Sequence, residues 1–311
     1  MTIRTIIQKL SSINEDFKRK KCFLPTIHSF VYAWAPYTKV GNVSKHRALM
    51  NYFLRYFEKS VQKHNFDFTK NYHLEPMRED SPIWTIWFQG ESMMPPIIRT
   101  CIDSIKRNAG NHPVIIITSD NLSQYIDIPR EIFEKIESKQ MSLTHMADLI
   151  RFFVLSKYGG WWFDSTVFVT KPIMNDGYNM YTVKSSVYRK RYIGGGCNWT
   201  AYLFACGKNN PFMPILRDAY LYYWLENETL IDYFMVDYII QLMYEKCPSF
   251  RKEIDKIPID NEGVNNLYIN RFCPYSDERW NHLTNLRFNK LNWRCGDPIP
   301  GSIFEKILKY D

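Results

Sequence analysis

The chain has 311 residues, enough for a large buried core, and it is 45% hydrophobic and 16% aromatic, which excludes an intrinsically disordered protein. Its formal net charge of +8 and pI of about 9.0 favour an anionic partner: nucleic acid, an anionic membrane surface or a phosphorylated substrate. The seven cysteines include no C-x-x-C pair, so we expect neither a zinc knuckle nor a disulfide framework, but reduced thiols in a cytosolic protein.

The first 80 residues differ from the rest in their basic clusters, such as Lys18-Arg-Lys-Lys21 and Ser44-Lys-His-Arg47. We expect a basic helical extension over residues 1–80 and a main domain over residues 81–311. The extension either caps the core of the main domain or docks on an anionic membrane, where each lysine or arginine near the surface adds about 1 kcal/mol. The chain starts without the apolar stretch of a signal peptide and has no run of ~20 apolar residues, so we expect a soluble or peripheral protein.

Strand and helix patterns alternate after Ser81-Pro82. Short apolar, strand-like runs lie at residues 83–88, 113–118 and 161–163, and helical patterns lie at 96–106, 129–137 and around Asp148. This order predicts an α/β fold with a mostly parallel sheet flanked by helices. In such sheets ligands bind beyond the carboxyl ends of the strands, where Gly90, Asp120 and Asp164 all fall.

The pattern is looser after Lys171-Pro172. We expect helices at residues 209–226, 231–244 and 303–310, with Asp237 in the middle of the second one. The run Gly194-Gly-Gly196 does not predict a phosphate-binding loop, because no clear strand precedes it and no Gly-Lys-Ser/Thr follows it.

Asp148 and Arg151 are the first candidate site residues. They stand three residues apart, so on a helix they share one face, and their helix is otherwise apolar. One alternative is a surface ion pair worth a few tenths of a kcal/mol. We favour the other alternative, a buried pair whose remaining hydrogen bonds go to sugar hydroxyls or phosphate, because buried charges need such partners.

Asp164 is the second candidate. Gly159-Gly160 is typical of a helix end, and the aromatic run Trp161-Trp-Phe163 then carries Asp164 to the end of a strand. With Ser165 and Thr166 it forms either a simple strand-end turn or a site for Mg²⁺ or Mn²⁺ that also binds a substrate diphosphate.

Three further positions have two interpretations each. Trp87 is either a core residue or a platform on which a planar base stacks. Asp120 and Asn121 form a turn or contact a ribose. His145, one turn before Asp148, is expected to pack or hydrogen bond rather than to act as a catalyst.

Two stretches resemble a known superfamily. Ala147-Asp-Leu-Ile-Arg151 and Lys157-Tyr-Gly-Gly-Trp-Trp-Phe-Asp-Ser-Thr166 resemble the sugar-binding DXD region of glycosyltransferases that include initiating mannosyltransferases of yeast type and the glucosylating clostridial toxins. The resemblance is closer to the bacterial capsular polysaccharide synthesis proteins, which share Ile83-Trp-Thr-Ile-Trp-Phe-Gln-Gly90. It covers residues 81–175 well and is looser at Tyr233–Asp237 and Asn289–Trp293.

The resemblance implies a GT-A-type, Rossmann-like fold and a retaining transfer from a nucleotide-sugar donor. It makes Asp148, Arg151 and Asp164 catalytic: the first two would bind the hydroxyls of the donor sugar, and Asp164 would hold the metal and the diphosphate. Trp162 would lie beside the donor and Trp87 would stack on its base. The full set expected at the donor is Trp87, Gln89, Gly90, Asp120, Asn121, Asp148, Arg151, Gly160, Trp162, Asp164, Ser165 and Thr166. Trp293 is expected on the acceptor side. Asp237 is either a second acceptor-side group or, as we favour, a buried, hydrogen-bonded aspartate.

Thr166 departs from the DXD pattern, because it stands where the second aspartate would be. A neutral hydroxyl cannot supply a carboxylate's charge, so a Mn²⁺ or Mg²⁺ held by Asp164 and Thr166 would depend on the diphosphate for most of its ligands. The acceptor implied is a glycan or lipid-linked oligosaccharide of capsule synthesis, which would place a cytoplasmic protein peripherally on the inner face of the plasma membrane.

Two other classes of protein are weighed against a transferase. Nucleic-acid binding is disfavoured, because the lysines and arginines are spread along the chain and no recognition motif is present. A non-catalytic module that binds a sugar or nucleotide is the other alternative, and Thr166 favours it.

Overall fold

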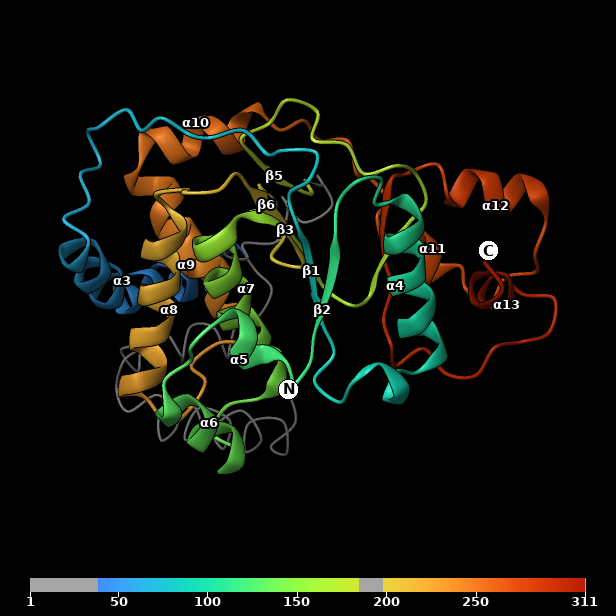
Figure 1. Cartoon of the computed structure of the whole chain (residues 1–311), viewed down its shortest axis with the longest axis horizontal. Coiled ribbons are helices and arrows are strands. Elements are labelled where there is room, and N and C mark those ends of the chain that lie inside the picture. Colours follow the sequence, from blue (N-terminus) through green and yellow to red (C-terminus); the bar gives the residue numbers. More distant parts are fainter. Residues whose placement is uncertain (1–38, 185–197, 311) are drawn as a thin grey trace.

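The computed structural model describes residues 39–184 and 198–310, so the basic cluster at 18–21 and the three glycines at 194–196 lie outside the described residues. A mixed five-stranded sheet stands at the centre, with helices on both sides (Figure 1). Its strand order is β2-β1-β3-β6-β5, with β1 at Ile83–Ile86, β2 at Val114–Ile117, β3 at Gly160–Phe163, β5 at Met180–Thr182 and β6 at Leu203–Cys206.

The sheet is parallel where the sequence predicts it to be. Strand β1 pairs in parallel with both β2 and β3, and all four of its residues are buried, as a strand covered on both faces requires. Strand β6 runs antiparallel to β3 and to β5, so four of the five strands point the same way. The mostly parallel α/β sheet flanked by helices is therefore confirmed.

A second, two-stranded sheet lies beyond β3. It pairs β4 (Val167–Val169) with β7 (Phe288–Lys290) in antiparallel fashion, so that Val167 stands opposite Lys290. This pairing brings a late segment of the chain next to the turn that follows Asp164.

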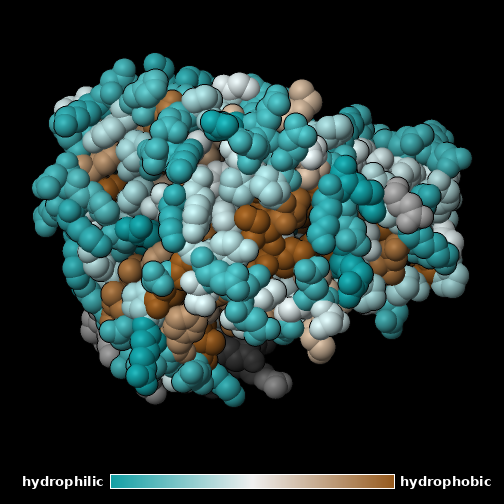
Figure 2. Space-filling model, viewed as in Figure 1, coloured by the Kyte–Doolittle hydropathy of each residue, from teal (hydrophilic) through white to brown (hydrophobic). Residues whose placement is uncertain are grey.

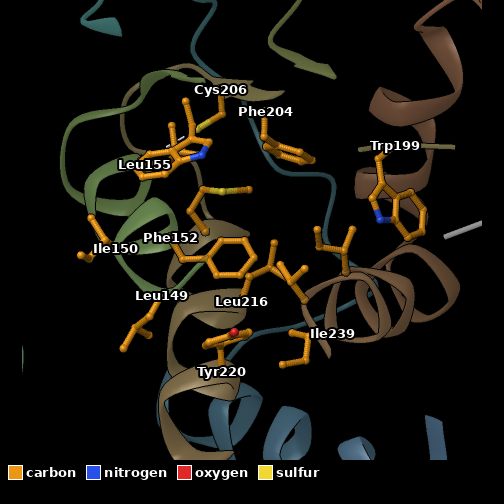
Figure 3. Packing of buried hydrophobic residues seen from close by; sticks show 14 of the residues in the cluster. Leu149, Ile150, Phe152, Leu155, Trp199, Phe204, Cys206, Leu216, Tyr220 and Ile239 are labelled. Carbon is orange, nitrogen blue, oxygen red and sulfur yellow. Dashed lines mark hydrogen bonds between the residues drawn. The ribbon is translucent and has the colours of Figure 1, made fainter. Parts of the chain in front are cut away.

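One side of the large sheet is covered by α3 (Lys39–Lys63), α7 (Leu143–Tyr158), α8 (Met213–Glu226) and α9 (Met235–Lys246) (Figure 1). Apolar side chains of α7, including Leu149, Phe152 and Leu155, pack with residues of β6, α8 and α9 (Figure 3). Helix α7 carries the candidate pair, so this packing fixes the pair against the sheet.

The other side is covered by α4 (Pro96–Asn108) and by the C-terminal helices α11 (Asn266–Ile269), α12 (Asp277–Leu283) and α13 (Ile303–Leu308) (Figure 1). They share a second hydrophobic cluster with Phe168 of β4. The remaining helices are η1 (Glu91–Met93), α5 (Leu122–Tyr125), α6 (Arg130–Glu137) and α10 (Pro248–Lys256).

Helix α3 shares the large core although it precedes residue 80. Its Phe53 and Phe57 are fully buried, and its Ser60 hydroxyl donates to the carbonyl oxygen of Ile215 on α8 at 2.9 Å. Nothing here separates α3 from the core of the main domain as a unit of its own, and the boundary at residue 80 stays a prediction.

The helix expected at 231–244 was placed too early. It begins at Met235, because the Asp232 carboxylate accepts a hydrogen bond from the backbone of Phe234 at 2.9 Å and turns the chain before the helix. Asp237 consequently lies in the first turn of α9 and not in its middle. The helix expected from residue 209 likewise begins at Met213, after the Asn210 side chain accepts from the backbone of Phe212 at 3.0 Å.

The paired glycines have separate structural roles. Gly159 ends α7 with a φ of +66°, and its N–H donates to the Leu155 carbonyl oxygen at 3.0 Å. Gly160 has a φ of +92°, and a Cβ at this position would lie 2.2 Å from the carbonyl oxygen of Pro82. No side chain fits there, so Gly160 allows β3 to pass close to the start of β1.

The outer face seen in Figure 2 is mostly hydrophilic, with hydrophobic residues gathered near its centre, where β1 and β2 lie in Figure 1. Within residues 39–184 and 198–310, none of the helices combines the length and the apolar character that crossing a membrane requires.

Candidate functional site

A cavity of about 730 Å³ opens beyond the carboxyl ends of β1 and β3. This is the size range of small-molecule sites, and the position is the one where open parallel sheets bind ligands. The cavity is lined by Ile86, Trp87, Phe88, Gln89, Leu143, Thr144, Ala147, Asp148, Arg151, Asp164, Ser165, Thr166, Tyr233, Asn265, Tyr268, Lys290, Leu291, Asn292, Trp293 and Arg294.

Helix α7 delivers the first two charged groups. Its N-terminus is capped by Ser142, whose side chain accepts from the backbone N–H of His145. Asp148 is 8% exposed and Arg151 is 2% exposed, and Nη1 of Arg151 lies 2.9 Å from Oδ1 of Asp148. The pair is therefore buried at the cavity wall, and the alternative of a surface ion pair is wrong.

Asp164 completes a charged cluster with that pair. Its Oδ1 lies 3.1 Å from Nη2 of Arg151 and accepts a hydrogen bond from Nε1 of Trp162 at 2.9 Å. Its backbone oxygen also accepts from the N–H of Val167 at 2.9 Å, so the strand-end turn and the cavity-facing carboxylate are both present. One guanidinium thus joins two carboxylates that come from a helix and from a strand end.

Lys290 is a site residue that was not predicted from the sequence. The β4–β7 register places it opposite Val167, and the backbone N–H of Leu291 donates to the carbonyl oxygen of Thr166 at 2.9 Å. Its ammonium donates to the Thr166 hydroxyl and lies 3.7 Å from Oδ2 of Asp164. Its only signal in the sequence is its place within Asn289–Trp293, a stretch that carried a loose family resemblance.

Burial shifts the ionisation of this cluster. It raises the pKa of Asp148 to about 6, against the opposing attraction of Arg151. It lowers the pKa of Lys290, while the nearby Asp164 carboxylate acts in the opposite direction. Burial also raises the pKa of Asp237 to about 8, and the negative charge of Asp148 adds to that effect. The Asp148–Arg151 pair is buried, while the Lys290 and Asp164 side chains are partly exposed at 23% and 32%.

Several expected donor residues do line the cavity. Trp87, Gln89, Ser165 and Thr166 are among them, and so is Trp293 from the acceptor side. The rings of Trp87 and Trp293 meet edge to face, with centroids 6.4 Å apart and planes at 80°. Two aromatic faces from distant parts of the chain therefore stand together in the cavity wall.

Other expected donor residues lie outside the lining. Trp162 is fully buried and contacts two cavity-lining residues, through its hydrogen bond to Asp164 and through the Arg151 guanidinium, which lies 5.2 Å from the centroid of its ring. Gly160 serves the close approach of β3 to Pro82, and Gly90, with a φ of +85°, precedes the short helix η1. Asp237 on α9 does not line the cavity either.

At Asp120 and Asn121 the structure shows the turn. The Asn121 side chain accepts from the backbone N–H of Thr118 at 2.8 Å and donates to the carbonyl oxygen of Ile116 at 2.9 Å, while Asp120 is exposed. His145 likewise makes a local hydrogen bond, with Nδ1 2.7 Å from the Ser142 hydroxyl.

The residues around Asp164 do not fit a divalent metal ion. Magnesium and manganese prefer several oxygen ligands, with anionic ones among them. Here both carboxylate oxygens of Asp164 face donors, and the Thr166 hydroxyl is bonded to Lys290. In the part of the chain that the structure describes, no three His, Cys, Asp or Glu side chains are grouped to hold a metal.

Comparison with known proteins shows the family of the chain. A family model described as capsular polysaccharide synthesis protein matches residues 36–306. The chain belongs to this family. The match begins before α3 and so runs across residue 80.

Two glycosyltransferases are similar to this member of the capsular polysaccharide synthesis family. The O-glycosyltransferase braB of Annulohypoxylon truncatum is 22% identical over 218 residues, which cover 65% of this chain and 50% of that protein. The chain thus spans about half the length of this curated relative. The solved structure of the PaToxG glycosyltransferase superposes with a TM-score of 0.42 at 15% identity, covering 70% of this chain and 84% of that chain.

Proposed function

We propose that this family member is a glycosyltransferase that moves a sugar from a nucleotide-sugar donor to a polysaccharide or lipid-linked oligosaccharide acceptor in capsule or surface polysaccharide synthesis. The observation that carries the proposal is the cluster of buried Asp148 and Arg151 with the partly exposed Asp164 at the wall of a large cavity beyond parallel strands. A GT-A-type fold and a peripheral location on the inner face of the plasma membrane are parts of the same proposal.

The donor sugar is assigned to the charged cluster. The Asp148 carboxylate would accept hydrogen bonds from sugar hydroxyls, and Arg151 keeps that carboxylate in place from 2.9 Å. The cavity also holds three cationic side chains, Arg151, Lys290 and Arg294, against two carboxylates. This balance suits a diphosphate, whose negative charge needs cations nearby.

The base and the acceptor are assigned to the aromatic walls. Trp87 is half-buried in the cavity wall, and we assign it to stack on the base of the donor. Trp293 and Tyr233 line the same cavity and are 46% and 62% exposed, which suits an acceptor sugar arriving from solvent. Asp237 lies outside the lining, so we assign the acceptor side to Trp293.

In the transfer itself, the bond between the anomeric carbon and the diphosphate oxygen breaks, and its electron pair stays on the diphosphate. The acceptor hydroxyl oxygen forms the new bond to the anomeric carbon, and its proton passes to the departing diphosphate. No described carboxylate is assigned as a covalent nucleophile, so we propose front-face attack with retention. Stabilisation of the leaving group's charge by fixed cations is the main catalytic contribution.

A thermal-shift screen against nucleotide sugars and nucleoside diphosphates, with and without Mn²⁺, tests this function. A ligand present at one hundred times its dissociation constant stabilises the protein by about 2.7 kcal/mol, which is readily measured. We expect one nucleotide class to raise the melting temperature. Binding of a nucleotide sugar without any release of its sugar would instead support the non-catalytic module that Thr166 favours.

A further inference from the structure

We propose that the ammonium of Lys290 takes the place of a divalent metal ion in the donor site, so that this chain binds and cleaves its donor without metal. The inference rests on the proposed transferase function. It concerns the cation that faces the diphosphate, for which the sequence alone predicts Mn²⁺ or Mg²⁺.

The backbone fixes the position of Lys290. It ends strand β7, whose Phe288 and Asn289 are fully buried, and the neighbouring N–H of Leu291 is bonded to Thr166. The side chain is 23% exposed, and its ammonium lies 5.2 Å from the centroid of the Tyr202 ring. Lys290 is therefore held in the cavity wall and does not extend freely into solvent.

The ammonium lies where a metal of a DXD site would be expected. It is bonded to the hydroxyl of Thr166, the position at which the second carboxylate is missing, and is 3.7 Å from the carboxylate of the first position, Asp164. The neutral Thr166 suits a site in which a lysine, and not a metal ion, supplies the positive charge. Without the second carboxylate a metal would lack an anionic ligand, whereas an ammonium needs only acceptors.

The surrounding charges also disfavour a metal. Arg151 approaches Asp164 to 3.1 Å on one oxygen, and Lys290 faces the other oxygen. A divalent ion bound to Asp164 would stand beside two cations and would share one carboxylate with them. Like charges at such distances repel one another, and each disfavours the charged form of the other.

Lys290 can perform the electrostatic part of the reaction. When the bond from the anomeric carbon to the diphosphate breaks, the electron pair goes to a diphosphate oxygen. The Lys290 ammonium would donate hydrogen bonds to that oxygen, and the acceptor proton would pass to the diphosphate as the new glycosidic bond forms. Arg294, which also lines the cavity, would add a second cation at its rim.

The test compares metal-free and metal-loaded protein in two assays. Affinities for UDP, GDP, ADP and dTDP are measured by calorimetry in EDTA and then in Mn²⁺, and sugar release from the matching nucleotide sugars is followed in both buffers. We expect the wild-type protein to bind one of the diphosphates and to release sugar from its nucleotide sugar equally well, within about twofold, in EDTA.

Lys290→Met keeps the length of the side chain and removes its charge. We expect it to lower diphosphate affinity about 10- to 100-fold, the usual effect of a lost charged hydrogen bond, and to leave the affinity for the corresponding nucleoside unchanged. If Lys290 had a purely structural role, its replacement would weaken the binding of the nucleoside and of the diphosphate alike. Lys290→Arg should retain most of the affinity, and Lys309→Met, at a lysine that is 70% exposed, is the matched control.

The outcomes separate this inference from the proposed function. Binding and release that require Mn²⁺ would overturn the role of Lys290 and leave the transferase standing. Unchanged diphosphate affinity in Lys290→Met would overturn it as well. If no diphosphate binds in EDTA and none binds in Mn²⁺, both the role of Lys290 and the proposed transferase function are overturned. If Lys290→Met does not fold, the comparison of the wild-type protein in EDTA and in Mn²⁺ still decides whether the donor site works without metal.

Discussion

Arg151 reaches Asp164 across the junction of a helix and a strand, with Nη2 of the arginine 3.1 Å from Oδ1 of the aspartate. The same guanidinium holds Asp148, so one buried cation orders two carboxylates that stand 16 positions apart in the sequence. A buried pair of this kind contributes little to stability by itself, because each charge has lost its water. We infer that the arrangement binds the nucleotide-sugar donor.

Asp164→Asn keeps the shape of the side chain and removes its charge. We expect sugar release from the nucleotide sugar to fall about 100- to 1000-fold, the range for losing a group that acts on the transition state, while the melting temperature stays nearly the same. Asp127→Asn, at an exposed aspartate, is the control. Normal turnover in Asp164→Asn would remove this carboxylate from the site.

Trp162→Phe keeps a buried aromatic ring but removes the N–H that donates to Asp164 at 2.9 Å. We expect turnover about 10-fold lower, because a hydrogen bond to a charged group is worth about 1.5–3 kcal/mol and only part of it bears on the transition state. Trp84→Phe also removes an indole hydrogen bond, to the Gly159 carbonyl oxygen, and should lower stability without this loss of turnover. Equal turnover losses in the two variants would contradict the specific role of Trp162.

The rate should fall in acid with the ionisation of Asp148. Burial raises the pKa of this carboxyl to about 6, opposed by Arg151 and supported by the charge of Asp164, and Tyr220 also hydrogen bonds to it. In the proposed function the ionised form accepts hydrogen bonds from sugar hydroxyls, so kcat/KM should decrease as the pH falls through about 6. Stability should change in the opposite sense, since a raised folded-state pKa favours the folded protein below pH 4 and loses that contribution towards pH 6. A kcat/KM profile that is flat from pH 8 to pH 5 would contradict the role of Asp148.

Asp218 ties α3 to α8 and provides a stability test away from the cavity. Burial would raise its pKa, but hydrogen bonds from Arg217, Lys63 and His64 lower it to about 2. Since the folded-state pKa lies below the unfolded value, the contribution of about 2 kcal/mol is full above pH 4 and is lost as the pH falls towards 2. Asp218→Asn should therefore destabilise the protein at pH 7, as measured by urea unfolding, and its effect should disappear near pH 2 to 3. An unchanged free energy of unfolding at pH 7 would show that α3 is not held through this cluster.

The part of the site that lies close together in the sequence could be predicted. Asp148, Arg151, the two glycines and Asp164 fall within 17 consecutive residues, where a helix leads directly into a strand. Local periodicity and glycine chemistry determine the geometry of such a segment, and the structure confirms the buried pair and the strand-end position. The strands at Val114–Ile117 and Gly160–Phe163 were predictable for the same reason.

The remaining features depend on contacts between distant segments. Lys290 reaches Thr166 through strand pairing across 124 positions, and three-residue strands such as β7 carry too little pattern to reveal their partners. The start of α9 follows a turn in which the Asp232 carboxylate accepts from the backbone N–H of Phe234, and hydrophobic periodicity does not show such a turn. The buried indole of Trp162 could be recognised as aromatic, but its bond to Asp164 follows only from its orientation in the folded strand.

The most direct measurement is sugar release from a panel of nucleotide sugars, followed by the appearance of free nucleoside diphosphate, with the wild-type protein and Asp164→Asn side by side. The account predicts release from one nucleotide class by the wild-type protein and release about 100- to 1000-fold slower by the variant. Release at equal rates by both proteins, or by neither when the wild-type protein is folded, would contradict a donor site built around Asp164.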